Sequence, residues 1–170
     1  MNVSEAIRSK RSVRQFSDRP VPGEDLTRIL NAGRLAGSSK NSQPWHFIVL
    51  KERRRLVELS QCGAWAGHLA GAAVGVALAT TDWRERWPVA FDLGLAAQNM
   101  MLAAHELGIG SVMANIYEVE RANALLELPP PLMCYAAISF GYPAATEDAE
   151  RSPRKGGRRT LDEIVHWEHW

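Results

Sequence analysis

The stretch from residue 90 to residue 107 constrains the fold more than any other part of the chain, because it is apolar on nearly every side. Its length and the Gly108 that follows predict a helix ending at this glycine. A helix without a polar face is stable only where most of its sides are covered. We therefore expect this segment to be a central core helix around which the other elements pack.

The chain shows no sign of a membrane helix or of a nucleic-acid surface. Gln98 and Asn99 interrupt the long apolar stretch, and residues 69–79 are about half as long as a bilayer span. A formal net charge of +1 argues against a bulk nucleic-acid binder and against a protein held at a membrane surface. The N-terminal residues lack the apolar core of a signal peptide, and Cys62 and Cys134 are far apart, as in a reduced protein. We expect a soluble, cytoplasmic chain.

Helices and short strands alternate along the rest of the sequence. Apolar residues at helical spacing predict the helices, and short apolar runs predict the strands, although residues 72–80 also fit a buried helix. Ser4 is a candidate N-cap, and Thr160 and Glu163 have the spacing of a capping box that begins a last helix. The pattern predicts an α+β layered fold in a single domain, residues 1–170. The expected helices cover 3–9, 24–36, 51–60, 90–107 and 117–127, and the expected strands cover 45–50, 72–80, 111–114 and 134–141.

Two basic clusters lie far apart in the sequence. Residues 10–14 combine three cations with a hydroxyl, and residues 154–159 precede the expected last helix. Arginine offers a fork of donors, lysine a point charge and serine a neutral donor, a mixture that suits a phosphate. The alternatives are a solvated basic face for the first cluster and a flexible basic loop for the second. The candidate phosphate ligands are Lys10, Arg11, Ser12 and Arg14 of the first cluster and the basic side chains of residues 154–159 in the second.

A polar loop over residues 38–45 is the third candidate site. It holds hydroxyls, two amides and backbone donors within eight residues. Carboxamides donate and accept, so they can pair with a planar heterocycle that displays both kinds of group. An ordinary polar turn is the alternative. The candidate ligands are the hydroxyls and amides of this loop, with Trp45 as a wall of the site.

The chain lacks the residue patterns of hydrolytic and of metal-dependent catalysis. Its five histidines have no metal-ligand spacing, so we expect no metal, and no Ser or Cys sits in a recognisable nucleophile context. The glycine patterns of dinucleotide folds and phosphate loops are absent as well. Ligands for a phosphate and a heterocycle, without an acid–base or nucleophile set, indicate a bound cofactor that does the chemistry.

Five segments, taken in their order and spacing, make the chain similar to the flavin-dependent nitroreductase family over nearly its whole length. They are AIRSKRSVRQFSDRPV, SSKNSQPWHFIVL, DLGLAAQNMMLAAHELGIGSV, FGYPA and RRTLDEIVHWEHW. The resemblance implies a central, mostly antiparallel sheet flanked by helices, in an intertwined homodimer that holds FMN at two interface sites. It also implies that NADH or NADPH reduces the flavin, which then reduces nitroaromatics, quinones or related acceptors.

The family's first motif binds the FMN phosphate and one edge of the isoalloxazine ring. The resemblance therefore implies that Lys10 and Ser12 meet the phosphate, with Arg11 beside them. Arg14 would place its charge near the N1–C2 carbonyl edge, where reduction leaves negative charge. The family more usually has Arg at position 10, so Lys10 would give up a bidentate phosphate contact.

The resemblance implies the other cofactor contacts too. The second motif comes from the partner subunit and packs on the ring. The strand after GIGSV supplies backbone N–H groups to the flavin N5–O4 edge, and the basic tail loop closes over the phosphate. These roles fall on Ser38, Ser39, Asn41 and Gln43, on Ala114 and Asn115, and on Arg158 with Arg159 second.

Residues 61–87 lie where members of the family differ most, so we expect them to line or cover the substrate site. Trp65, Trp83 and Trp87 would stack on a flat acceptor, with core or dimer packing as the alternative for each. The expected activity is a ping-pong oxidoreductase. The rivals are a flavin-binding or storage protein without turnover, a specialised family member, and a basic interaction module. The acceptor and the choice between NADH and NADPH stay open.

Overall fold

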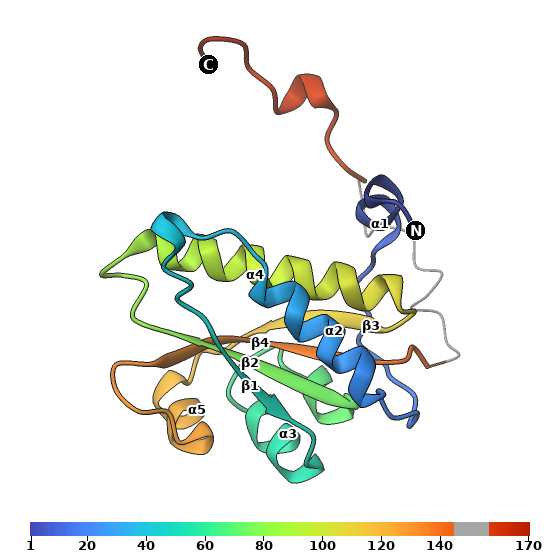
Figure 1. The fold of residues 1–170 in the computed structure, drawn as a ribbon, viewed down its shortest axis with the longest axis vertical. Coiled ribbons are helices and arrows are strands. Elements are labelled where there is room, and N and C mark those ends of the chain that lie inside the picture. The colour runs from blue at the N-terminus through green and yellow to red at the C-terminus, as the bar shows by residue number, and fades with distance from the viewer. Residues whose placement is uncertain (145–156) are drawn as a thin grey trace.

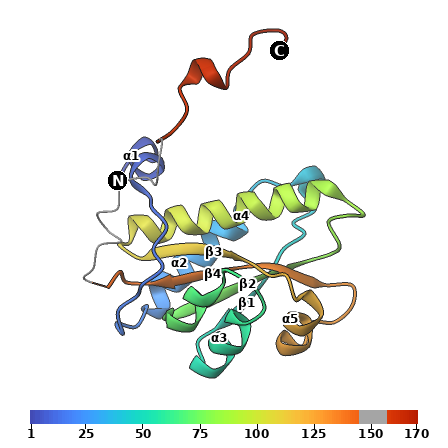
Figure 2. The ribbon, with the colours of Figure 1, turned by 180° about the vertical axis from the view of Figure 1, so that it is seen from behind.

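The structure is a computed structural model that describes residues 1–144 and 157–170. A four-stranded sheet lies between two helical layers, which Figures 1 and 2 show from opposite sides. The elements are α1 (Val3–Ser9), α2 (Gly23–Arg34), η1 (Ser39–Asn41), β1 (His46–Leu50), α3 (Arg53–Ser60), η2 (Gly67–Gly71), β2 (Val74–Thr80), α4 (Trp87–Glu106), β3 (Gly110–Asn115), α5 (Val119–Leu126), β4 (Met133–Gly141) and η4 (Leu161–Glu163).

The sheet has the strand order β1-β2-β4-β3, and every neighbouring pair is antiparallel. This confirms the predicted antiparallel sheet flanked by helices. All seven residues of β2 are buried, as expected for a central strand covered on both faces, and the alternative of a helix over residues 72–80 is wrong. β3 is an edge strand, and its outer edge is where the N-terminal segment joins it.

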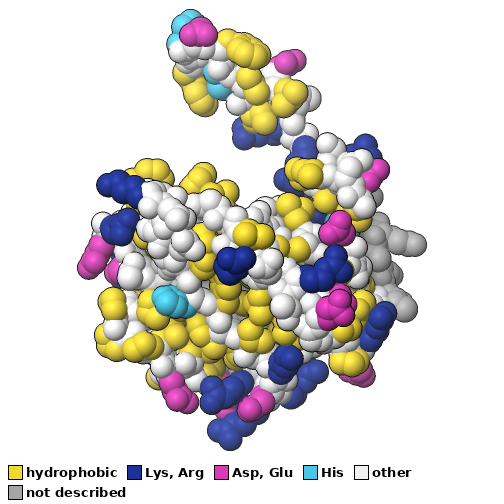
Figure 3. Space-filling model, viewed as in Figure 1, with side chains coloured by type: hydrophobic (Ala, Val, Ile, Leu, Met, Phe, Trp, Pro, Cys, Tyr) yellow, Lys and Arg dark blue, Asp and Glu magenta, His cyan; other side chains and the backbone are white. Residues whose placement is uncertain are grey.

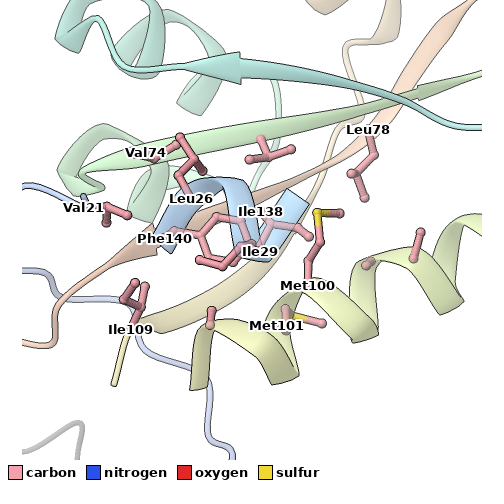
Figure 4. Close-up of a cluster of buried hydrophobic side chains, with 14 of the residues drawn as sticks. Val21, Leu26, Ile29, Val74, Leu78, Met100, Met101, Ile109, Ile138 and Phe140 are labelled. Carbon is pink, nitrogen blue, oxygen red and sulfur yellow. The ribbon is translucent and has the colours of Figure 1, made fainter. Parts of the chain in front are cut away.

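The two faces of the sheet carry separate hydrophobic clusters. On one face α2 and α4 pack against the sheet, where Ile29 and Met100 meet Ile138 and Phe140 (Figure 4). On the other face α3, α5 and η2 cover Leu50, Ala77 and Ala137 among others. Burial of these apolar side chains is the main source of stability for a fold of this kind.

α4 is the expected core helix, but a single chain covers only one of its sides. Leu93, Ala97 and Met100 are among the residues buried against the sheet and α2. The opposite side is also apolar and lies open, with Trp87 72% and Phe91 64% exposed. We expect most sides of this helix to be buried, but within one chain only the side that faces the sheet and α2 is covered.

The two chain ends differ from the sequence expectations in detail. Asn2, not Ser4, caps α1, because its side chain accepts from the Glu5 N–H in a capping box. The capping box of Thr160 and Glu163 is confirmed. It begins only the short turn η4, so the expected last helix is wrong.

The C-terminal arm, residues 157–170, projects away from the body of the chain and carries apolar side chains along its length (Figure 3). Leu161, Trp167 and Trp170 are all exposed. Among the described residues, a helix in this position would have no apolar surface to pack against, which explains why the chain extends after η4. Within the described residues, no helix is long and apolar enough to cross a bilayer.

Candidate functional site

The first basic cluster is held against the outer edge of β3. Ser12 forms a parallel bridge with Ser111, and the Val13 N–H donates to the Ser111 carbonyl over 3.1 Å. Val13 is buried against Gly110, where a Cβ would come within 2.7 Å of the Val13 Cβ. A glycine at position 110 therefore lets the segment lie on the strand, while the neighbouring Ser12 and Arg14 stay exposed.

A surface pocket of about 230 Å³ opens beside this segment, where α1, the C-terminal end of α4 and the start of β3 meet. Its walls include a lysine, an arginine, a histidine and two serines. The lining residues are Ser9, Lys10, Arg11, Val13, His105, Gly108, Ile109, Gly110, Ser111 and Pro143.

The pocket is cationic, and among residues 1–144 and 157–170 no carboxylate lines it. Burial, with a smaller effect from Arg14, lowers the pKa of the Lys10 ammonium. Lys10 Nζ reaches Met101 Sδ over 3.6 Å, and none of the ion pairs within residues 1–144 and 157–170 involves Lys10 or Arg14. A half-buried cation without a counter-charge is stabilised by a bound anion.

His105 and Arg11 complete the polar wall of the pocket. His105 Nε2 lies 2.8 Å from Ser9 Oγ, and burial followed by the charges of Lys10 and Arg11 lowers the pKa of this imidazole. The Arg11 guanidinium turns back to donate to the carbonyls of Arg8 and Lys10. The Ser111 hydroxyl is buried without a hydrogen-bond partner among the described residues. This donor set fits the phosphate of a phosphomonoester such as FMN.

The second motif is a tight turn at η1. Lys40, Asn41 and Gln43 have φ angles of 53°, 54° and 47°, a left-handed conformation that non-glycine residues seldom adopt. Ser38 Oγ accepts from the Gln43 N–H over 3.0 Å, and Gln43 Nε2 donates to Asn41 Oδ1 over 3.2 Å. The amide side chains are therefore held on the outer side of a defined loop.

The loop is also tied to α4. The Ser39 N–H donates to both carboxylate oxygens of Asp92, over 3.2 and 3.1 Å. Asp92 is only 4% exposed and is not among the site residues predicted from the sequence. The signal was present, because Asp92 is the one charged residue from Trp87 to His105. His105 and Ser111 were missed for lack of any comparable pattern.

One chain does not bring the two motifs together. Figures 1 and 2 show α1 beside the C-terminal end of α4 and η1 beside its N-terminal end. Ser9 contacts His105 and Ser39 contacts Asp92. At a rise of about 1.5 Å per residue, the axial distance from Asp92 to His105 is roughly 20 Å.

The two candidates on β3 differ in the direction of their backbone groups. The Ser111 carbonyl faces the outer edge of the sheet, where it accepts from Val13. Direction alternates along a strand, so the Asn115 backbone also faces this outer edge, where its carbonyl lies against Gly63. The Ala114 backbone instead faces β4 opposite Ala137. Of the two predicted donors, Asn115 is the better placed for a ligand.

The remaining candidates lie in exposed segments. Trp83 contacts Tyr135 edge to face at 6.4 Å between ring centroids, while Trp65 and Trp87 are largely exposed. Arg158 and Arg159 are exposed on the arm and make no ion pair with any residue that the structure describes. The rest of the second basic cluster, residues 154–156, lies outside the described residues. In residues 1–144 and 157–170, no group of His, Cys, Asp and Glu could hold a metal ion.

Comparison with known proteins identifies the family of the chain. The profile of the family described as "Nitroreductase family" matches residues 7–67 and 54–142. The chain therefore belongs to the nitroreductase family.

Three relatives match nearly the whole chain. A candidate NADH dehydrogenase/NAD(P)H nitroreductase of Archaeoglobus fulgidus is 36% identical over 96% of this chain and 96% of its own length. A protein of Methanothermobacter thermautotrophicus with the same name is 32% identical over 100% of this chain and 88% of its own length. The solved structure of an FMN-dependent nitroreductase from Clostridium difficile superposes with a TM-score of 0.82, at 27% identity, over 99% of this chain and 100% of that one.

Proposed function

We propose that this chain is an FMN-dependent oxidoreductase that takes electrons from NADH or NADPH and passes them to nitroaromatics, quinones or related flat acceptors in a ping-pong cycle. The cationic pocket beside the Lys10–Arg14 segment carries the proposal, because it supplies a phosphate site at the edge of a sheet in a nitroreductase-family fold. The name of the Clostridium difficile neighbour supports FMN. The NAD(P)H nitroreductase names of the relatives support the nicotinamide donor.

We propose further that the working unit is a homodimer in which each site takes residues from both chains. Two observations support this. The apolar side of α4 lies open, with Trp87, Phe91 and Leu95 exposed, and an uncovered apolar face of this kind is typical of an interface. The phosphate pocket and the η1 loop are also at opposite ends of α4, so a second chain running the other way would bring them together.

In this proposal the two ends of the cofactor are bound by different parts of the chain. Lys10, which lines the pocket, and Ser12, exposed beside it, bind the phosphate, and Arg14 holds a positive charge at the pyrimidine edge of the ring. The Asn115 backbone N–H, on the outer edge of β3, orients the opposite edge. FMN, when bound, supplies the acceptance and donation of electrons that no side chain of this set can provide.

The η1 loop of the second chain has the other role. Ser39 and Asn41 would pack on the ring and exclude water from the reacting face, which strengthens the electrostatic effect of Arg14 there. Ser38, whose hydroxyl accepts from the Gln43 N–H, would keep the loop in shape. Arg158 and Arg159, on an arm without cover from its own chain, would close over the phosphate.

The test is spectroscopic and kinetic. We expect the purified protein to be yellow, to bind added FMN, and to oxidise NADH or NADPH in the presence of menadione or nitrofurazone. Stopped-flow mixing of the flavin-loaded protein with each nicotinamide separates an enzyme from a storage protein, because only an enzyme is reduced at a rate that supports turnover. A colourless protein that neither binds FMN nor oxidises nicotinamides would end the proposal.

A further inference from the structure

Among the described residues, Asp92 is a charged residue whose burial the packing of the fold does not explain. It lies in the apolar stretch of α4 and is 4% exposed, and burying a carboxylate is unfavourable unless a specific partner compensates. Its hydrogen-bond donor within the described residues is the Ser39 N–H, which meets both carboxylate oxygens. The partner is therefore the backbone of the η1 loop, 53 residues away in sequence.

That loop needs such an anchor. Lys40 and Asn41 both have left-handed backbone conformations, which cost free energy and persist only where surrounding contacts determine them. The hydrogen bonds within the loop join Ser38 to Asn41 and Gln43, Ser39 to Ser42, and Gln43 to Asn41. The bond from Ser39 to Asp92 is the one that fixes the loop to the rigid helix.

The hydrogen bond to Asp92 also determines which polar groups of the loop remain able to bind a ligand. The Ser39 N–H is bound to Asp92 and the Ser38 hydroxyl is bound by the Gln43 N–H. The Ser39 hydroxyl has no hydrogen bond to any described residue, and Asn41 is exposed. The loop thus leaves Ser39 Oγ and Asn41 Nδ2 without a partner among the described residues, because Asn41 Oδ1 already accepts from Gln43.

We propose that Asp92 is a positioning residue for the flavin site: it holds the η1 loop in the one conformation that presents Ser39 and Asn41 to the FMN bound by the partner chain. Asp92 does not itself reach the cofactor. The inference rests on the proposed function for the identity of the ligand, while the anchoring of the loop is a property of the chain without flavin.

The first experiment measures amide hydrogen exchange in the flavin-free wild-type protein. The Ser39 N–H is bonded to Asp92, whereas the backbone N–H of Lys40 has no acceptor among the described residues. We expect the Ser39 amide to exchange at least about tenfold more slowly than the Lys40 amide next to it. Equal exchange at the two amides would overturn the inference, and this measurement does not depend on FMN binding or on any variant folding.

The second experiment compares three variants. Asp92→Ala removes both acceptors, Asp92→Asn keeps one, and Asn99→Ala is the matched control. Asn99 is a partly buried polar residue of the same helix that donates to the Ala32 carbonyl of α2 and does not touch the loop. We expect Asp92→Ala to weaken FMN binding about tenfold or more, Asp92→Asn to lie between it and the wild type, and Asn99→Ala to bind like the wild type.

A local readout accompanies the affinities. Limited trypsin digestion followed by mass spectrometry should show faster cleavage after Lys40 in Asp92→Ala, but not in Asn99→Ala, even if both lower the melting temperature. FMN affinity and Lys40 cleavage that are the same in Asp92→Ala as in Asn99→Ala would refute the positioning role. A wild-type protein that binds no FMN would instead refute the proposed function.

Discussion

Ser12 lies opposite Ser111 in a parallel bridge, so a residue of the N-terminal segment extends the edge of the sheet next to β3. The bridge fixes the direction of the chain from Lys10 to Arg14. Since side chains alternate along an extended segment, Val13 turns into the protein while Ser12 and Arg14 turn out. The placement of the proposed phosphate ligands thus depends on how closely this segment can approach β3.

Gly110→Ala should disturb that approach. The new Cβ would come within 2.7–2.9 Å of three Val13 atoms, so the segment must move away from β3. We expect a loss of about 1–3 kcal/mol in the free energy of unfolding, together with weaker FMN binding. Gly71→Ala is the control, because a Cβ there meets nothing within 4 Å. Denaturant unfolding and flavin titration measure both effects, and equal behaviour of the two variants would contradict the role given to Gly110.

Arg14→Ala should change the flavin potential as well as its affinity. A fixed cation near the N1–C2 carbonyl edge favours the reduced, negatively charged form, so its removal should lower the potential and slow reduction by the nicotinamide. Arg14→Lys keeps a charge, so its flavin potential and affinity should lie between those of Arg14→Ala and of the wild type. Arg54→Ala, which removes an exposed arginine paired with Glu58, is the control. A potential and an affinity that stay unchanged in Arg14→Ala would exclude the assigned role.

The strands were predictable from the sequence because each is a short apolar run. Residues 72–80 and 134–141 overlap β2 and β4 within two residues at each end, since a strand buried on both faces has no polar positions to confuse the pattern. The basic cluster at residues 10–14 is also visible in the sequence, because three cations and a hydroxyl gather within five residues, and its binding of a phosphate stays a prediction.

Contacts between distant segments were not predictable from local patterns. The bond between Ser39 and Asp92 joins a loop to a helix, and no spacing rule connects them. The end of the chain shows the same limit. The spacing of Thr160 and Glu163 predicts a capping box correctly, but whether a helix continues depends on a surface to pack against, which one chain does not provide.

His68 should make the stability of the protein depend on pH. His68 Nδ1 lies 2.7 Å from Ser139 Oγ, and burial, with a smaller effect of Arg14, lowers the pKa of His68 below 6.5. As the pH falls through about 6.5, the unfolded chain takes up a proton that the folded chain resists, so stability decreases on the acid side.

His68→Asn keeps a polar contact for Ser139 without a titrating group. We expect its melting temperature to fall less steeply than that of the wild type between about pH 7 and pH 5. Some slope should remain, because the pKa of His105 is lowered too. His46→Asn, on an exposed position of β1, should keep the wild-type slope. Parallel curves for all three proteins would show that His68 does not contribute.

Phe91→Glu should dissociate the proposed dimer without unfolding the chain. Phe91 is 64% exposed in the single chain, so a carboxylate there remains hydrated in a monomer but would be buried in an interface. We expect light scattering to give the mass of one chain, 18.9 kDa, with loss of FMN binding. Val57→Glu is the control, an exposed apolar residue of α3 on the other side of the sheet. A dimeric Phe91→Glu protein would place the interface elsewhere.

Mixed dimers test whether the two motifs serve one site from different chains. Arg14→Ala impairs the motif on one side of the proposed site and Asn41→Ala the motif on the other side, so each homodimer has two defective sites. A heterodimer of the two variants has both defects in one site and leaves the other site intact. Random reassociation makes about half of the dimers heterodimers, each with one good site, so the mixture should recover about a quarter of the wild-type activity.

If both motifs served the same site from one chain, each chain would keep its own defect and mixing would recover nothing. Differently tagged chains, purified as heterodimers, give the decisive measurement of one FMN-competent site per dimer.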